Sequence, residues 1–362
     1  MTAHHLPVPF FAALAGMLMA CGSVMVIEPP PPDEIVDPPP PAVMNDGGAP
    51  DAPPDADGVK DADVPDTAPP VPPVDPGIYL SRGPWMLGHP ACLLNAAGTV
   101  SCWHHAGAED PWITGAAWEV PGITDAITVT DAHEQGCALH ATGHVACWGW
   151  SHHGQLGLSI PIEAKSLDPI ELPGVELVQL TTSHHAMCGI RPSGQAVCWG
   201  GAYEGPLGAP TPWESQAEVE VIGVSDAVDI SGSPGRVCAV HATGKVACWI
   251  DHQAPVEVAG VEGAVQVSAS SQCVLLASGQ IMRPAVGGGM VTIPGLNDAV
   301  LVSGACARRA GGGVVCWDAM GALSTIAVNN ATDLSGECAV KSDGSAVCWK
   351  PGSAPTPFPS VD

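Results

Sequence analysis

The stretch from Cys137 to Trp150 reads CALHATGHVACWGW, and it recurs along the 362-residue chain with few changes. Its counterparts are CGIRPSGQAVCWGG from Cys188, CAVHATGKVACWID from Cys238 and CAVKSDGSAVCWKP from Cys338. In each copy two cysteines stand ten positions apart, with a glycine between them and a tryptophan after the second. Repetition at intervals of about 20–50 residues is typical of a solenoid, a propeller or an array.

The cysteine spacing is the same in every complete copy of the repeat. The six pairs are Cys92 with Cys102, Cys137 with Cys147, Cys188 with Cys198, Cys238 with Cys248, Cys306 with Cys316, and Cys338 with Cys348. A seventh copy begins at Cys273, but Arg283 stands where its second cysteine would be. The chain therefore contains seven units.

Each cysteine pair fits a β-hairpin. A turn at Ala141-Thr142-Gly143 places Cys137 opposite Cys147, and the glycine supplies the positive φ that a short turn needs. Opposed residues are close enough for a cross-strand disulfide, which an exported chain would form. The alternative is six pairs of buried thiols; zinc fits less well, because structural zinc sites use closer pairs. We expect Cys273 to be a buried free thiol.

A second strand precedes most hairpins. Segments such as PGITDAITVT, IGVSDAVDIS and PGLNDAVLVS begin with a turn, with Asp125, Asp226 and Asp298 as turn formers, and then alternate as a strand. An inner strand, a hairpin and, in the longer units, a connecting strand make the four-stranded blade of a propeller. Seven units thus predict an all-β fold, a seven-bladed β-propeller; whether blades five to seven keep four strands stays open.

Two segments carry a family resemblance. WGWSHHGQLG (148–157) and WGGAYEGPLG (199–208) resemble the Trp-Gly-x-Asn-x-x-Gly-Gln-Leu-Gly signature of regulator-of-chromosome-condensation repeats, and the resemblance extends over residues 77–362. It implies a seven-bladed propeller that acts through protein contacts. It also implies a blade shared by the chain ends, and residues 356–362 match residues 169–175. We therefore expect the C-terminus to complete the first blade.

The first 21 residues have the pattern of an export signal. An apolar run from Pro9 to Met19 is too short to span a bilayer, and it is followed by Ala20-Cys21. The Leu-Met-Ala-Cys ending resembles the lipobox of bacterial lipoproteins, which implies that Cys21 is lipidated and anchored in the outer membrane of a cell envelope. An ordinary cleaved signal, with Cys21 incidental, is the alternative. No transmembrane helix is expected elsewhere.

Residues 22–76 are predicted to be a disordered acidic tether rich in proline, with Lys60 as the only basic residue. A passive spacer explains the segment, although proline tracts can also bind partner grooves. The whole chain carries 37 acidic and 11 basic residues, a net charge of -26, which argues against a nucleic-acid partner.

Tryptophans fall into two groups. Those after the hairpin cysteines are expected to pack between blades. The alternative is that they form a ring on which a ligand stacks. The others are expected in loops, where an exposed aromatic can anchor a partner; they are Trp85, Trp112, Trp118, Trp150 and Trp213.

Candidate chemistry is sparse. Histidine pairs occur at residues 104–105, 152–153 and 184–185; they could converge on one rim, but adjacent strand residues point to opposite faces. No hydrolase, zinc-protease, calcium-loop or phosphate-loop motif occurs. We therefore expect no catalytic residues, no metal and no cofactor.

Three functions remain open. The chain is predicted to be a non-catalytic, envelope-anchored protein-binding module, a monomer whose partner is an unidentified envelope or secreted protein. The family resemblance implies guanine-nucleotide exchange as an alternative, although an exported chain would not meet an intracellular GTPase. Glycan binding or catalysis through the central channel is the third possibility.

Overall fold

The computed structural model describes residues 79–82, 91–103, 117–132, 135–158, 161–162, 164–201, 207–210, 214–251 and 253–358. These residues belong to one compact unit; Cys21 and a second unit, Val24–Ala68, lie outside the described residues. Where the structure describes the chain, it contains no helix long and apolar enough to cross a membrane.

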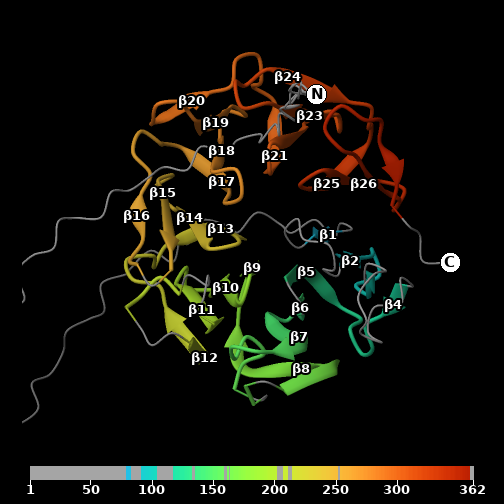
Figure 1. The fold of residues 1–362 in the computed structure, drawn as a ribbon, viewed down its shortest axis with the longest axis vertical. Helices are drawn as coiled ribbons and strands as arrows, with labels where there is room; N and C mark the ends of the chain where they lie inside the picture. The colour runs from blue at the N-terminus through green and yellow to red at the C-terminus, as the bar shows by residue number, and fades with distance from the viewer. Residues whose placement is uncertain are drawn as a thin grey trace, which may run out of the picture. The chain divides into compact units, whose positions relative to one another are not determined.

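The described chain forms seven antiparallel sheets, each made of four consecutive strands (Figure 1). Blade 1 contains β1 (Tyr79–Arg82), β2 (Ala91–Leu94), β3 (Val100–Trp103) and β4 (Ala117–Glu119); blade 2 contains β5 (Ala126–Ala132), β6 (Gln135–His140), β7 (His144–Ser151) and β8 (Ala164–Glu176); blade 3 contains β9 (Gln179–Ser183), β10 (Ala186–Ile190), β11 (Ala196–Gly201) and β12 (Glu214–Glu220); blade 4 contains β13 (Ala227–Ser233), β14 (Arg236–His241), β15 (Val246–Ile250) and β16 (Val256–Glu257). Blade 5 contains β17 (Ala264–Ser268), β18 (Cys273–Leu276), β19 (Ile281–Pro284) and β20 (Met290–Thr292); blade 6 contains β21 (Ala299–Ser303), β22 (Cys306–Arg309), β23 (Val314–Trp317) and β24 (Leu323–Ile326); blade 7 contains β25 (Ala331–Ser335), β26 (Cys338–Lys341), β27 (Ala346–Cys348) and β28 (Thr356–Pro357). The predicted seven-bladed β-propeller is confirmed, and blades 5 to 7 keep all four strands.

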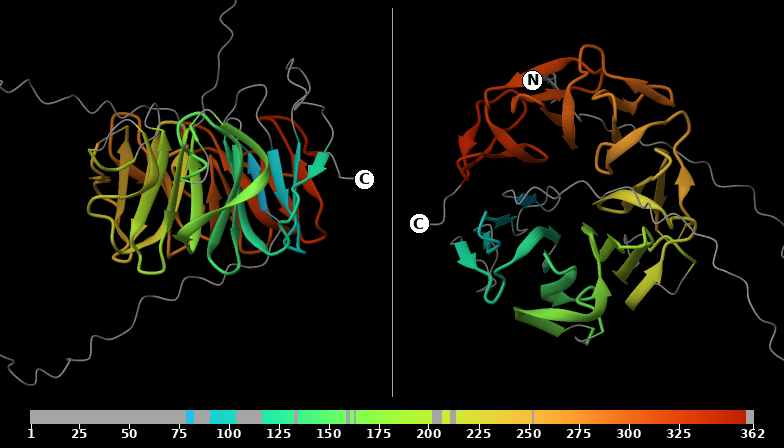
Figure 2. Two further views of the ribbon diagram at one scale, coloured as in Figure 1. Left: turned by 90° about the horizontal axis from the view of Figure 1, so that it is seen from below. Right: turned by 180° about the vertical axis from the view of Figure 1, so that it is seen from behind.

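The first strand of each blade lies innermost. Each of these strands contacts the first strand of the next blade, and β25 contacts β1 to close the ring (Figure 1). In the edge-on view of Figure 2 the strands run from one side of this ring to the other. We call the side that carries the turns between second and third strands the hairpin rim. The opposite side, which carries the turns between first and second strands and the loops between third and fourth strands, is the loop rim.

The ring closes without a shared strand, and this corrects the expectation for the C-terminus. Residues Thr356–Pro357 form β28, which pairs with β27 in blade 7. Blade 1 already has four strands because Tyr79–Arg82 supplies its innermost one, so no place is left for a returning strand. Leu93 of β2 instead packs against the core of blade 7 beside Val340. Residues 359–362 lie outside the described residues.

The hairpins have the predicted register, and all six predicted cysteine pairs are disulfides in the structure. Leu139, for example, lies opposite Val145. The Cα–Cα distances of the disulfides lie between 3.9 and 4.1 Å. Cys273 lies outside these disulfides and is fully buried, as expected. The disulfides join Cys92 to Cys102, Cys137 to Cys147, Cys188 to Cys198, Cys238 to Cys248, Cys306 to Cys316, and Cys338 to Cys348.

The second cysteines are not all equally buried, although each lies directly opposite its partner in the hairpin. Cys102 and Cys198 are fully buried. Cys248, Cys316 and Cys348 are only partly buried, and they pack against the edges of the core clusters of blades 4, 6 and 7. The alternative of paired thiols enclosed in a core therefore does not describe these three positions, whereas the cross-strand disulfide describes all six pairs.

The tryptophans that follow the hairpin cysteines hold neighbouring blades together, which confirms the packing interpretation for those the structure describes. Trp199 of blade 3 is 1% exposed and packs with Leu139 and Leu156 of blade 2. Its indole Nε1 donates a hydrogen bond to the carbonyl oxygen of Gln155, 3.0 Å away. Trp249 packs in the same way against blade 3, together with the buried Leu207. The Gly-x-Leu-Gly loops therefore supply leucines that fill the space between blades.

A set of hydroxyl side chains links the innermost strands. The residue opposite the first cysteine is serine or threonine in all seven blades: Ser81, Thr130, Thr181, Ser231, Ser268, Ser303 and Ser335. In four blades this side chain accepts a hydrogen bond from a backbone N–H of the next blade, at 2.8–3.1 Å. The innermost strand has one open edge, and these bonds satisfy donors along it.

Candidate protein-binding surfaces

A chain of aromatic and imidazole rings lies on the loop rim of blades 2 and 3. Trp150 and His152 have ring centroids 4.2 Å apart. His153 lies 4.8 Å from His185, and His185 lies 4.0 Å from His184. The rings of His152 and His153 are 6.4 Å apart and join the two halves. We call these five residues the ring cluster. Two of the three predicted histidine pairs thus converge, whereas His104 and His105 lie outside the described residues.

Buried glutamines anchor the two loops that carry the histidines. The side chain of Gln155 accepts a hydrogen bond from the backbone N–H of His153 at 2.7 Å. Gln135 is 2% exposed, and its amide donates to the carbonyl oxygen of His184 at 3.3 Å. The loops are therefore fixed from below, so the ring cluster is held in place before any partner binds.

Glycines in β11 make room for the cluster. A Cβ atom at Gly201 would lie 2.3 Å from the Cβ of His153, and one at Gly200 would lie 2.5 Å from the carbonyl oxygen of His185. Gly200 also has a φ of 103°, which other residues rarely adopt. The Trp-Gly-Gly sequence after the disulfide thus allows the histidine loops to lie directly over the strand.

The charge around the cluster is mixed. His153 Nδ1 lies 3.6 Å from the carboxylate of Glu214, and Lys165 Nζ lies 5.2 Å from the centroid of the Trp150 ring. Over the parts of the chain that the structure describes, no group of three or more His, Cys, Asp or Glu side chains is arranged to hold a metal ion. Four of the five rings are partly exposed and His185 is buried beneath them. Partly exposed rings with both charges nearby are suited to holding another molecule by stacking and hydrogen bonds.

The predicted partner-binding tryptophans lie in different places in the structure. Trp150 belongs to the ring cluster, although it lies in strand β7 and not in a loop. Trp118 also lies in a strand, β4, and packs against the core between blades 1 and 2, so its prediction as a loop residue is wrong. Trp85, Trp112 and Trp213 lie outside the described residues. The strand before the inter-blade turn in blade 1 is β4, which has only three residues. A strand this short shows no alternating pattern in the sequence.

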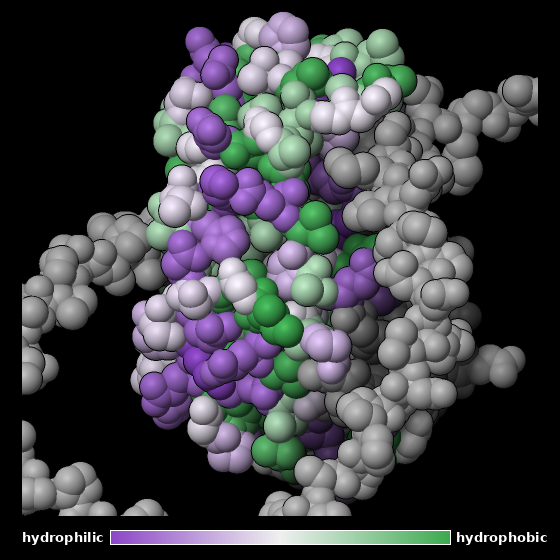
Figure 3. Space-filling view, turned by 90° about the vertical axis from the view of Figure 1, so that its left-hand side faces the viewer, coloured by the Kyte–Doolittle hydropathy of each residue, from purple (hydrophilic) through white to green (hydrophobic). Residues whose placement is uncertain are grey.

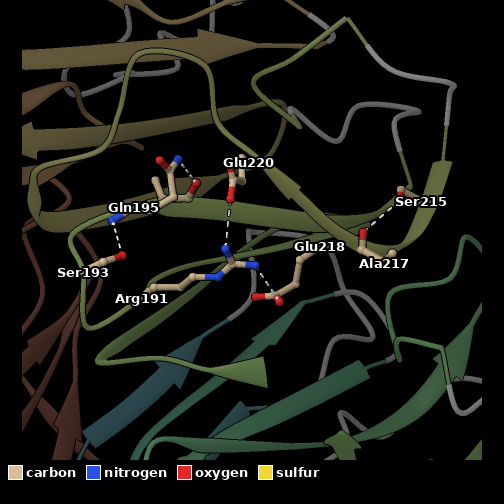
Figure 4. Close-up of polar contacts among 8 residues, drawn as sticks. Arg191, Ser193, Gln195, Ser215, Ala217, Glu218 and Glu220 are labelled. Carbon is tan, nitrogen blue, oxygen red and sulfur yellow. Dashed lines mark hydrogen bonds and ion pairs between the residues drawn. The ribbon is translucent and has the colours of Figure 1, made fainter. Parts of the chain in front are cut away.

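The hairpin rim carries a repeated basic side chain that sequence reasoning missed. The residue three positions after the first cysteine is His140, Arg191, His241, Arg309 or Lys341 in five blades, and each lies within 3.5 Å of a carboxylate. Arg191 follows β10, and its guanidinium donates to Glu218 and Glu220 of β12 at 3.0 and 3.1 Å (Figure 4). The constant offset from the cysteine was the signal that would have revealed this position.

Three of these side chains hold the turns between blades. Asp125 and Asp226 were predicted only as turn formers, but each carboxylate also lies 2.5 Å from Nδ1 of a histidine, His140 or His241. The Nε–H of Arg309 is shared between the two carboxylate oxygens of Asp298, at 2.9 and 3.0 Å. The basic side chain at this position thus links the second strand of a blade to the turn that leads into the same blade.

One buried carboxyl stands out at the inner ring. Asp229 of β13 accepts hydrogen bonds from the amide of Gln179 at 3.0 Å and from the backbone N–H of Val267 at 2.8 Å. Burial raises the pKa of Asp229 to about 6, although these hydrogen bonds oppose the shift. Through these bonds Asp229 links blades 3, 4 and 5.

The outer side of the disc has a mixed surface in the view toward β16. Hydrophilic and apolar residues are interspersed there, with hydrophilic ones gathered in patches (Figure 3). Exposed apolar residues near this side, such as Val256 on β16 and Ile222, are separate positions of the kind common on protein surfaces.

The fold and the ring of disulfide-bearing hairpins define the class of this protein, a seven-bladed β-propeller with the architecture of regulator-of-chromosome-condensation proteins. No family model matches the sequence, and no curated protein matches it.

Solved structures match the fold. Prp20p from Saccharomyces cerevisiae is similar with a TM-score of 0.50 and 13% identity, over 67% of this chain and 72% of that chain. Yeast RCC1 (Prp20) bound to Kap60 matches with a TM-score of 0.47 and 13% identity, over 75% and 69% of the two chains. The CRINKLY WD40 ectodomain of the Arabidopsis thaliana receptor kinase ACR4 matches with a TM-score of 0.44 and 16% identity, over 78% and 97%.

Proposed function

We propose that the chain is a non-catalytic protein-interaction module, tethered to a bacterial cell envelope through lipid on Cys21, and that the ring cluster docks its partner. The ring cluster carries the proposal: Trp150 and the four histidines lie in ring contact across two blades, and all of them except the buried His185 are partly exposed. Aromatic residues in such positions contribute much of the binding energy of protein interfaces.

The similar fold supports the same class of function. The crystal structure of Prp20p is described together with its binding to Gsp1p and histones. These partners belong to that protein. For this chain they support only the general role of a propeller as a protein-binding scaffold, because fold alone does not select a partner.

Quantitative crosslinking in the native envelope tests the proposal. The full chain, Trp150→Ala and Val256→Ala would be expressed at equal levels, crosslinked briefly and captured. Val256 is the matched control, since it is 53% exposed on β16 of blade 4. We expect one protein to be captured by the full chain and the control, and at least about tenfold less by Trp150→Ala.

Two results would contradict the proposal. Equal capture by Trp150→Ala and by the full chain would remove the ring cluster from the interface. Capture of no protein, together with retention on a panel of envelope glycans, would replace protein binding by glycan binding.

The anchor is tested separately. A chain grown with labelled palmitate should carry the label, and Cys21→Ser should lose it and leave the membrane fraction. A Cys21→Ser chain that stays with the membrane would exclude lipid on this residue as the anchor.

A further inference from the structure

Blade 7 departs from the contacts that hold the turns of the hairpin rim. In blades 2, 4 and 6 the basic side chain at the end of the second strand bonds to an aspartate in the turn that leads into the same blade. These aspartates are Asp125, Asp226 and Asp298. The corresponding residue of blade 7 is Asn330, because its carbonyl oxygen accepts a hydrogen bond from the N–H of Ser342 at 2.9 Å, as that of Asp298 does from Ala310. The turn of blade 7 therefore offers Lys341 an amide in place of a carboxylate.

The charge of Lys341 is only weakly compensated. Its Nζ lies 3.5 Å from the carboxylate of Asp343, and the two side chains are 30% and 64% exposed. The carboxylate of Asp343 also accepts hydrogen bonds from the N–H and the hydroxyl of Ser345, at 2.9 and 2.6 Å. Ion pairs at the surface contribute little to stability, so the contact with Asp343 does not tie the ammonium group down. An ammonium group has three donors, and Lys341 can direct them to a ligand.

A cavity lies beside Lys341 on this rim. Its volume is about 460 Å³, which is within the range of small-molecule sites. Val328, Val347 and Pro357 give it an apolar wall, and Asn330 and Lys341 belong to its polar wall. The cavity thus combines an apolar surface with one cation and a neutral amide.

The cavity borders a shortened connection between blades. Four residues, 327–330, connect β24 to β25, whereas six residues, 293–298, connect β20 to β21. The shorter connection has no counterpart of the Pro294-Gly295 turn. Asn330 has a φ of 58°, a left-handed conformation that asparagine tolerates and that Asp298 does not adopt. The cavity and the missing carboxylate therefore occur at the same turn.

We propose that this cavity binds a singly charged carboxylate that carries an apolar group, the chemistry shared by a small carboxylic acid and the C-terminus of a polypeptide. The carboxylate of the ligand would pair with Lys341, as the turn aspartates pair with the basic side chains of other blades. The apolar group would contact Val347 and Pro357. Asp343, which also lines the cavity, and the net charge of -26 disfavour a doubly charged phosphate.

An NMR titration of the isotope-labelled full chain tests the site. The probes are acetyl-valine, acetyl-valinamide, acetate, and an acetylated peptide of three glycines and a C-terminal valine. With acetyl-valine we expect the backbone amide signals of Asn330 and Ser342 to shift, and that of Ala310, beside Asp298 in blade 6, to stay. Acetyl-valinamide lacks the charge and acetate lacks the apolar group, so each should bind at least about tenfold more weakly.

The two free acids with a valine distinguish the sources of the ligand. Tighter binding of the peptide than of acetyl-valine would assign the site to a polypeptide C-terminus. Tighter binding of acetyl-valine would assign it to a small acid. Both results support a carboxylate with an apolar group as the ligand.

Three substitutions separate the site from the general charge of the protein. Asn330→Asp supplies the carboxylate that other blades have at this turn, so it should compete with the ligand and lower the affinity for acetyl-valine at least about tenfold. Lys341→Met should lower it by a similar factor. Lys350→Met removes the same charge at an exposed residue between β27 and β28, and it should leave the affinity unchanged. Disulfide mapping and the melting temperature check that the three variants fold.

Several results would overturn the proposal. Equal affinity for acetyl-valinamide would remove the carboxylate from recognition, and equal affinity for acetate would remove the apolar wall. An unchanged affinity of Asn330→Asp or Lys341→Met, or an equal loss for Lys350→Met, would show that the ligand does not bind in the cavity. Unshifted signals of Asn330 and Ser342 with every probe would have the same meaning. None of these results depends on Trp150, so the proposed function is tested independently.

Discussion

In four of the seven blades, one hydroxyl side chain satisfies a backbone donor at the centre of the propeller. The innermost strand of each sheet has an open edge, and unpaired backbone N–H groups on it are costly when buried. In blades 3 to 6 the hydroxyl opposite the first cysteine accepts from the next blade, as Ser268 does from the N–H of Gly304 at 2.9 Å. The repeated Ser or Thr is thus explained by the neighbouring blade and not by its own.

Removing one of these hydroxyls should destabilise the ring. Ser268 is 4% exposed, so Ser268→Ala leaves the N–H of Gly304 without its acceptor. We expect a loss of about 1–3 kcal/mol in the free energy of unfolding, measured by denaturant titration. Ser278→Ala, in an exposed turn of the same blade, is the control and should change it by less than about 0.5 kcal/mol.

Asp229 should make stability depend on pH in an unusual direction. Its pKa is raised from 3.8 to about 6 in the folded state, so the folded chain holds this proton more tightly than the unfolded chain. The protonated Asp229 therefore contributes to the free energy of unfolding. This contribution is complete below about pH 4 and is lost as the pH rises through about 6, and it is about 3 kcal/mol at most. The difference in unfolding free energy between the protein and Asp229→Asn should therefore fall over this range. A difference independent of pH would contradict the assignment.

At the scale of the elements, the hairpins were predictable residue by residue, because a separation of ten with a central glycine leaves one register. Leu139 opposite Val145 is an example. The outer strands were not. β4 has three residues and β28 has two, so neither shows a period, and β28 resembles the start of a new unit because Pro357 precedes a hydrophobic residue as in other blades. Such short strands form because a neighbouring strand pairs with them, and the sequence pattern does not show which strand that is.

The Gly-Gln-Leu-Gly loop should stabilise the boundary between blades 2 and 3 by filling it with an apolar side chain. Leu156 is fully buried in that boundary, whereas Leu158, two residues later, is 68% exposed. Leu156→Ala should lower the free energy of unfolding by about 2–5 kcal/mol. Leu158→Ala in the same loop should have an effect below about 0.5 kcal/mol. Equal effects of the two substitutions in thermal or denaturant unfolding would show that the loop does not fill the boundary.

Blade 5 lacks a disulfide only because of one residue. Val274 pairs with Met282 and Leu275 with Ile281. Extending this register by one residue would place Cys273 opposite Arg283, as the two cysteines lie in the other six blades. Arg283→Cys should therefore form a seventh disulfide when the chain folds under oxidising conditions. A non-reducing peptide map checks it: the linked peptide should be present in the variant, and Cys273 should remain alkylatable after unfolding in the parent chain. If the variant folds under oxidising conditions and still has two alkylatable thiols after it is unfolded, the register ends before Cys273.

At the scale of the whole molecule, the number of blades followed from counting repeats, but the closure of the ring did not. From the family resemblance we expected the two chain ends to share a blade. In the structure, Leu93 of blade 1 packs against the core of blade 7 instead. The candidate site was predicted in part. Trp150 and two histidine pairs were singled out, but the contact between blades 2 and 3 that unites them depends on loop paths held by Gln135 and Gln155.

The boundaries between blades should differ in strength. A second row of bonds joins blades 3 to 6, where Gln179, Asp229 and Gln266 accept from Ile230, Val267 and Val302 of the following blade. Leu301 occupies this position in blade 6 and cannot accept a bond from blade 7. We expect the backbone amide of Leu334 to exchange with solvent at least about tenfold faster than that of Val302, measured by hydrogen exchange with NMR detection. Equal protection of the two amides would contradict this ranking.

Closure without a shared strand has a consequence for how such a chain is made. Every blade is completed by residues that follow one another directly, so blade 1 has all four strands and its disulfide partners long before β28 is synthesised. A propeller whose last residues must return to its first blade has to wait for the whole chain. This one can assemble blade by blade during its synthesis, and each of the six disulfide-forming cysteine pairs is complete before the next pair arrives.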